Sequence, residues 1–299
     1  MVFRIVTRGK YLQELNRALT RAAGMLILLL AIFCAPLEAM AAADESEDQG
    51  WQFIVTPYVW VVGLEGDLTI KGRTADVDAS FLDIIRNSDS IFGFLGNFEV
   101  RKGRWGAFVD GTYLDLESDT VRFGPVSSDA KVKVALISFG ASYRLAEWSL
   151  ADAPGGDPSY AGQKMVVDFY AGGRYTSLDG TLDANINLTP GPLNLSAGRK
   201  FKGSPDWVDP IFGLRTTTEV FPKIKLLLAG DIGGFGAGSD FTWHADGLLG
   251  YDFSLFSKKS TVWAGYRALY QDYETGSGRN RFEWKMTMHG PVTGLSIHF

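Results

Sequence analysis

Apolar and polar residues alternate with a period of two along most of the chain after residue 50. In segment 164–178, Val167 and Phe169 share one face. Asp168 and Arg174 share the other face. Because successive side chains of a strand point to opposite sides, this alternation predicts a β-strand with one apolar and one polar face.

Ten segments carry this alternation: 51–62, 91–102, 105–118, 131–146, 164–179, 207–219, 223–234, 241–254, 259–272 and 282–299. Most are longer than the ~5–6 residues typical of strands in soluble sheets, and a tilted strand crosses a bilayer in about 9–11 residues. The apolar faces are almost free of Lys, Asp and Glu. The pattern therefore predicts an all-β protein, an antiparallel up-and-down transmembrane β-barrel of about ten strands, with eight or twelve as alternatives.

The connections between these segments differ in length on the two sides. Short turns are predicted at 102–104, 221–222 and 255–258, and the longer connection 147–163 is an exception on that side. The other side receives 63–90, 119–130, 180–206, 235–240 and 273–281, which are mostly longer and rich in Gly, Asp and Ser. Short periplasmic turns and longer outer loops are typical of outer-membrane barrels.

One predicted loop contains a helical pattern. Phe81, Ile84 and Ile85 follow helical spacing within 79–87, and Ser80 could cap the helix. A helical turn resting on the barrel rim is the favoured interpretation, and a lid or an inward plug is the alternative.

The glycine-rich run 233–238 joins two strands, which favours a tight turn over a phosphate-binding loop.

The chain ends in Thr293-Gly-Leu-Ser-Ile-His-Phe299, which places Leu295, Ile297 and Phe299 on one face. This ending resembles the C-terminal signature of Gram-negative outer-membrane β-barrel proteins. The resemblance implies recognition by the barrel assembly machinery, escort by periplasmic chaperones, and contact with outer-membrane lipid and lipopolysaccharide. The start, 51–60 followed by Gly63, is similar to the first strand of a family of uncharacterised proteobacterial barrel proteins, which implies no activity.

The last segment contains a break in the alternation. Trp284, Met286 and Met288 have the parity opposite to that of Leu295 and Phe299. One extra residue in a strand moves the following side chains to the other face. The sequence therefore predicts a bulge near Gly290 and Pro291.

The polar faces give the candidate lumen-lining residues: Asn97, Glu99, Arg101, Asp110, Arg144, Asp168, Arg174, Asp209, Arg215, Asp231, Asp246 and Arg267, with Glu283 and Lys285 as further candidates. Buried charges must be paired, so one interpretation is a network of ion pairs that fills a narrow barrel. The other is a polar channel for small solutes. Open aqueous pores belong to barrels of roughly 16–18 strands, which favours a filled or very narrow lumen.

Aromatic residues recur near the strand ends: Trp51, Trp60, Trp105, Tyr113, Tyr143, Trp148, Tyr175, Trp207, Trp243, Tyr251 and Tyr270. These residues predict the two aromatic girdles that a transmembrane barrel places at the membrane interfaces.

Residues 1–43 have the three regions of a signal peptide: five basic residues, the apolar run 25–34, and small residues at 39–43. The run is shorter than the roughly 20 apolar residues of a spanning helix. We expect export through a cleaved signal peptide, an acidic linker over 44–50 and a barrel over 51–299 in the outer membrane. Cleavage would remove Cys34, the only cysteine.

Composition and motifs exclude several functions. The chain has 29 Lys and Arg against 34 Asp and Glu, and this acidity argues against binding nucleic acid. The sequence contains no metal-binding or cofactor-binding motif. His244 with Asp240 or Asp246 is the one pair that suits a general base, but no serine motif accompanies it.

The sequence therefore predicts an integral barrel with a structural or surface role, or with narrow passive passage of small solutes. It predicts no enzymatic activity and no catalytic residue. An outer-membrane hydrolase or acyltransferase around His244 is one alternative. A soluble periplasmic all-β binding protein is the other.

Overall fold

A computed structural model describes residues 50–70, 72–80, 90–123, 126–149, 163–185, 200–203 and 205–299. These residues form thirteen strands and one turn of 3-10 helix, Gly278–Asn280. The predicted signal peptide, almost all of the predicted linker and the loop positions 81–89 lie outside the described residues. The signal peptide, the linker and the helix over 79–87 therefore stay predictions.

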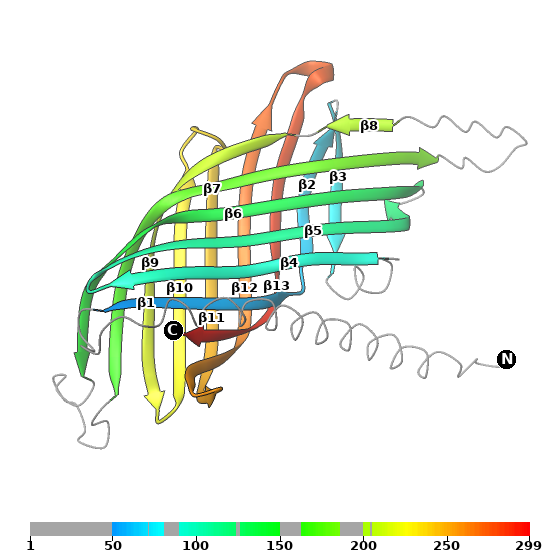
Figure 1. Cartoon of the computed structure of the whole chain (residues 1–299). Coiled ribbons are helices and arrows are strands. Elements are labelled where there is room, and N and C mark those ends of the chain that lie inside the picture. Colours follow the sequence, from blue (N-terminus) through cyan, green and yellow to red (C-terminus); the bar gives the residue numbers. More distant parts are fainter. Residues whose placement is uncertain are drawn as a thin grey trace, which may run out of the picture.

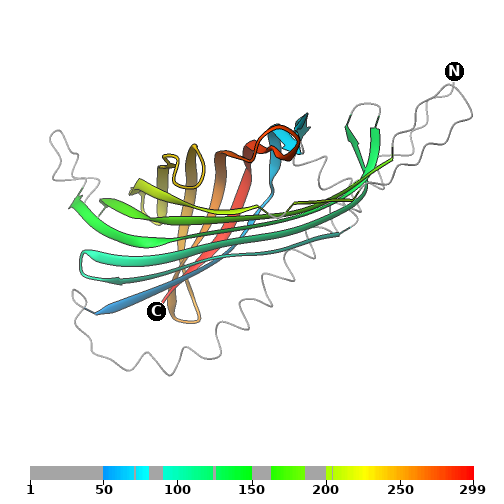
Figure 2. The same cartoon turned by 90° about the horizontal axis from the view of Figure 1, so that it is seen from above.

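Ten strands form a closed antiparallel barrel (Figure 1): β1 Trp51–Trp60, β4 Ser90–Lys102, β5 Trp105–Phe123, β6 Val126–Ser149, β7 Lys164–Asn185, β9 Asp206–Phe221, β10 Ile224–Gly234, β11 Phe241–Leu255, β12 Lys258–Thr275 and β13 Phe282–His298. Each strand pairs with the next, and β13 pairs with β1, from Ile54 opposite His298 to Trp60 opposite Val292. The predicted up-and-down barrel of ten strands is confirmed. Figures 1 and 2 together show it as flattened, with β1, β4 and β5 facing β10–β12.

Three further strands lie where loops were predicted. β2 (Gly63–Ile70) and β3 (Arg73–Ala79) form a hairpin, and β2 continues the register of β1 along β13. β8 (Lys200–Gly203) pairs with β7. The prediction of loops over 63–90, 119–130 and 180–206 was too broad, since β5, β6 and β7 also extend into these segments.

Short turns and both ends of the barrel chain lie on the same side of the molecule. Trp51 pairs with Lys102 beside the turn at Gly103 and Arg104, and Phe299 exchanges backbone hydrogen bonds with Phe53. The turn between β11 and β12 has positive φ at Phe256 and Ser257, as a two-residue type I′ hairpin requires. Short turns mark this side as the periplasmic end.

The outer face of the barrel carries a belt of exposed apolar side chains, which includes Phe98, Val109, Phe139, Phe169, Phe212, Leu214, Leu228, Ile232, Leu249, Val262 and Tyr266. Leu249 is 59% exposed and Leu214 is 52% exposed. A contiguous apolar surface of this extent is rare on proteins in water. Together with a closed wall and a polar interior, it is the surface of a transmembrane barrel.

The predicted bulge near Gly290 and Pro291 is wrong. β12 and β13 pair without a register shift, from Ser260 opposite Ile297 to Thr275 opposite Phe282. Trp284, Met286 and Met288 therefore face the same side as the lumen-lining Ser296 and His298. Leu295, Ile297 and Phe299 have the opposite parity, on the outer side of the strand.

Each strand keeps the same inward and outward parity along its length, but the environment outside the wall changes. Above the apolar belt the outer face carries polar side chains, among them Glu65, Asp67, Asp272, Glu283 and Lys285. Glu283 and Lys285 were predicted as further lumen candidates. This prediction is wrong, because both side chains lie on the outer face. They form an ion pair with the Lys285 Nζ 2.8 Å from the Glu283 Oε1, and this hydrogen bond lowers the pKa of Glu283. Water replaces lipid outside the wall there, so the apolar side chains turn inward.

These inward side chains form one apolar core at the extracellular end of the barrel, made of Tyr58, Trp60, Val77, Leu95, Val134, Leu136, Leu178, Trp207, Leu269, Trp284, Met286, Met288 and Val292. Met286 and Met288 are each 1% exposed. Below, the lumen is polar. The barrel interior therefore has two compartments of opposite character.

Candidate functional site

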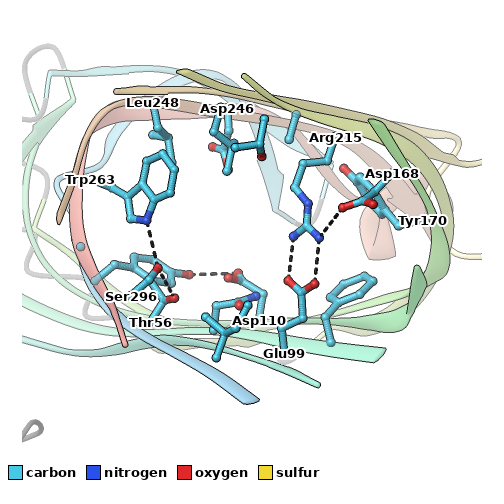
Figure 3. Close-up of a pocket in the computed structure, with 18 of the residues that line it drawn as sticks. Thr56, Glu99, Asp110, Asp168, Tyr170, Arg215, Asp246, Leu248, Trp263 and Ser296 are labelled. Carbon is cyan, nitrogen blue, oxygen red and sulfur yellow. Dashed lines mark hydrogen bonds and ion pairs between the residues drawn. The ribbon is translucent and has the colours of Figure 1, made fainter. Parts of the chain in front are cut away.

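The lumen contains a cavity of about 470 Å³. It is lined by side chains from all ten barrel strands, several of which Figure 3 shows pointing toward one another across the lumen. Eleven of the twelve predicted lumen residues line it: Asn97, Glu99, Arg101, Asp110, Arg144, Asp168, Arg174, Arg215, Asp231, Asp246 and Arg267.

Asp209, the twelfth predicted residue, lies outside the cavity lining and is fully buried. Its carboxylate accepts hydrogen bonds from the backbone N–H and hydroxyl of Ser239, at 2.6 and 2.8 Å, and from the indole N–H of Trp207 at 3.0 Å. These three donors stabilise its charge. Asp209 thus fixes the β10–β11 turn against β9.

A first group of charges lies in the periplasmic half of the lumen, and we call Glu99, Arg101, Arg144, Asp168 and Arg215 the periplasmic cluster. Arg215 donates to both oxygens of Glu99, at 2.8 and 2.9 Å, and to Asp168 at 3.1 Å. Arg101 donates to Glu99 at 2.6 Å and to Asp168 at 2.7 Å. Arg144 donates to Asp168 at 3.4 Å, so two carboxylates are shared among three guanidinium groups, as Figure 3 shows for Arg215.

A second group crosses the lumen one layer higher, and we call Tyr58, Arg267, Asp246, His244, Asp231 and Arg174 the mid-barrel network. Arg267 binds both oxygens of Asp246 at 2.9 Å and donates to the Tyr58 hydroxyl at 3.0 Å. Arg174 donates to Asp231 at 2.9 Å. The network joins strands that are far apart in sequence across the lumen, and so holds the two faces of the flattened barrel together.

His244 is the link between the two halves of this network. Its Nδ1 lies 3.1 Å from the Asp231 Oδ2, and its Nε2 lies 3.3 Å from the Asp246 Oδ1. The sequence predicted Asp246 as a partner. Asp231 comes from the neighbouring strand β10, opposite His244 in the register. In the described part of the chain, Asp240 forms no hydrogen bond or ion pair with the ring. Both ring nitrogens are therefore engaged by carboxylates.

The structure adds aromatic residues that sequence reasoning did not place in the lumen. Trp60 and Trp207, predicted as girdle residues, are buried inside, whereas Trp51, Trp105 and Trp148 are exposed outside. The alternation signal was available for Trp60, which shares its parity with Thr56 and Tyr58. The girdle prediction relied on position near a strand end. It was wrong for Trp60 and Trp207 because the extracellular ends of these strands lie above the lipid.

Other site types are not found within the described ranges. None of the helices in these ranges could span a membrane. No group of three or more His, Cys, Asp or Glu side chains in the same ranges could hold a metal ion.

No protein-family model and no curated protein sequence matches the chain. Among solved structures, Neisserial surface protein A is similar at 12% identity, with 84% of this chain and all of that chain covered and a TM-score of 0.31. The outer-membrane protease OmpT from Escherichia coli is similar at 9% identity, with 86% and 99% covered and a TM-score of 0.41. Ail of Yersinia pestis matches at 9%, with 84% and 99% covered and a TM-score of 0.30.

The chain is an outer-membrane β-barrel. This conclusion rests on its own closed wall, apolar belt and polar lumen. The similar structures are also barrels of Gram-negative outer membranes. At these identities and TM-scores the likeness carries no argument about activity.

Proposed function

We propose that this protein is a closed, non-conducting outer-membrane barrel that acts through its surfaces and not by passing solutes. The observation that supports this proposal is the apolar core, in which thirteen buried side chains of the described residues pack together at the extracellular end of the barrel. Hydrated ions and small polar solutes would lose their hydration in such a core, at a large cost in free energy. The polar cavity ends beneath it.

The size of the barrel supports the same proposal. Ten strands are close to the number at which side chains fill the interior, and aqueous channels belong to barrels of roughly 16–18 strands. The long strands β5, β6 and β7, together with the β2–β3 hairpin, extend the wall beyond the apolar belt. This extension gives the protein a structured extracellular surface.

The two alternatives have less support. An enzyme around His244 would need a free imidazole nitrogen, yet carboxylates engage both nitrogens. In the described part of the chain no hydroxyl group hydrogen-bonds to this ring, so a serine nucleophile has no activating partner there. A soluble periplasmic protein would have to expose the apolar belt to water.

We also propose partners for the barrel. Leu295, Ile297 and Phe299 share the outward face of β13, and this face would be the one that the barrel assembly machinery recognises. Lipid and lipopolysaccharide would cover the apolar belt and the polar rim above it.

Conductance of the purified barrel in planar lipid bilayers tests the proposal. We expect no steady ohmic current from the natural sequence. The double variant Met286→Ala and Met288→Ala truncates two core side chains that are each 1% exposed, and it should raise ion leakage. Leu249→Ala on the lipid face should not raise it. Discrete, long-lived conductance steps by the natural barrel would overturn the proposal, provided that the protein shows the gel shift on heating that marks a folded barrel.

A further inference from the structure

The lumen cavity has two chemically different walls. Its upper wall is apolar, formed by Trp60, Leu136, Ile211, Leu269 and Val292, and Leu248 adds an apolar side chain on the periplasmic side of Asp246 in β11. Its lower wall consists of the charged side chains of the mid-barrel network and the periplasmic cluster. A cavity of 470 Å³ lies within the range of roughly 300–1,000 Å³ found for small-molecule sites. Such a site suits a molecule that has one apolar and one polar part.

The charges of the lining favour an anionic polar part. Eight Lys or Arg residues line the cavity against six Asp or Glu residues, although the chain as a whole is acidic. Arg144 and Arg215 are the partly open members of the periplasmic cluster, with side chains 28% and 25% exposed. Their guanidinium groups are well suited to a carboxylate or a similar anion.

One buried donor in the upper wall lacks a partner. The indole N–H of Trp207 donates to Asp209, and that of Trp263 donates to Ser296. The indole N–H of Trp60, which also lines the cavity, has no acceptor in the described part of the chain, and Trp284 in the apolar core shares this property. Trp60 is 4% exposed. A buried unpaired N–H is unfavourable, and this N–H is covered in the structure, so an acceptor oxygen of a bound molecule would stabilise it when the ring turns toward the ligand.

Access to the cavity is from the periplasmic end. The lining includes residues at that end of several strands: Gln52, Lys164, Lys225, Lys259 and His298. The apolar core lies at the other end. A ligand would therefore enter from the periplasm with its apolar part leading.

We propose that the lumen binds a small elongated amphiphile with an anionic head and an oxygen acceptor in its apolar part. The head lies beside Arg144 and Arg215, the chain lies along Leu248 and Ile211, and the oxygen accepts a hydrogen bond from Trp60. This site goes beyond the proposed surface role and does not depend on it, because a ligand can bind in a cavity that conducts nothing.

The test measures binding to the barrel in lipid nanodiscs by titration calorimetry, with empty nanodiscs subtracted. The probes are ω-hydroxy fatty acids of eight, ten and twelve carbons, the matching fatty acids without the hydroxyl, and decylamine. We expect saturable binding of one molecule per barrel, about five- to tenfold tighter for the best hydroxy acid than for its parent acid, as one additional hydrogen bond would give. Decylamine should bind more weakly than decanoate.

Three variants locate the site. Leu248→Trp fills the middle of the cavity and should abolish binding, whereas Leu249→Trp, the next residue on the lipid face, should leave binding unchanged. Trp60→Phe keeps the ring and removes the donor, so it should erase the advantage of the hydroxyl and spare binding of the parent acid. All three must keep the gel shift of a folded barrel.

Two results would overturn the site as a whole, and a third would overturn the assignment of Trp60 as donor. The first is heat from the acids that empty nanodiscs reproduce in full. The second is saturable binding that persists in Leu248→Trp, since the molecule would then lie elsewhere. A hydroxyl preference that survives in Trp60→Phe would show that Trp60 is not the donor.

Discussion

At the scale of single residues, the lumen is stabilised by charges that share partners. Glu99 is 5% exposed and accepts hydrogen bonds from Arg101 and Arg215. Glu147, at the periplasmic rim, also pairs with an arginine, Arg144, but its side chain is 33% exposed. Removal of one partner from a buried pair leaves an uncompensated charge, whereas water compensates an exposed one.

Glu99→Gln should therefore destabilise the barrel by about 3 kcal/mol, because Arg101 and Arg215 lose a charged partner in a buried site. Glu147→Gln is the matched control and should cost at most ~1 kcal/mol. Urea unfolding of the barrel in lipid vesicles, followed by tryptophan fluorescence and by the gel shift, measures both. Equal losses for the two variants would contradict the burial argument.

At the scale of secondary structure, β13 passes through two environments with a constant register. Its inward residues change from Ser296 and His298 near the periplasm to Trp284 and Met286 near the outside. The outward residues change in the opposite sense, from Ile297 to Lys285. A strand that leaves the bilayer exchanges lipid for water on its outer face, and the interior is then the only apolar environment left.

Met286→Lys should prevent stable folding or cost at least about 3 kcal/mol, since the ammonium group would be buried without a partner in the apolar core. Thr287→Lys, one residue away on the outer polar face, should be tolerated. The folded fraction after refolding into lipid vesicles, read from the gel shift, distinguishes them. A bulge in β13 would predict the reverse order, with Met286→Lys on the outside and Thr287→Lys within.

At the scale of the whole molecule, the ends of the barrel differ in construction. The β4–β5 turn, the β9–β10 turn and the β11–β12 turn are tight and lie on one side, together with Trp51 and Phe299. The β2–β3 hairpin, the 3-10 turn Gly278–Asn280 and the long ends of β5–β7 lie on the other (Figure 1). From this asymmetry we expect the short turns to face the periplasm.

Single cysteines test the orientation, in a background in which Cys34 is replaced by Ser. Ser277→Cys, exposed in the β12–β13 connection, should react with a membrane-impermeant maleimide on intact cells. Arg104→Cys, exposed in the β4–β5 turn, should react only after the outer membrane is made permeable. Labelling in the reverse order would show that the barrel is inserted with its short turns outside.

The sequence by itself determined that the chain forms a β-barrel and which side chains of each strand share a face. Period-two alternation depends only on neighbouring residues, so it identified ten strands, their apolar outer belt and the inward parity of residues such as Asp168 and Arg267. The signal peptide and the recognition of Phe299 by the assembly machinery stay predictions.

The tertiary structure decided which environment each face of a strand contacts and which charged side chains form pairs. Alternation tells the two sides of a strand apart, but it cannot show where lipid gives way to water, so Trp60, Met286 and Lys285 were assigned wrongly. The partners of a charge come from distant strands: Arg215 meets Glu99 and Arg267 meets Tyr58. Such pairs depend on the closure and flattening of the barrel, which bring together residues that no local spacing connects.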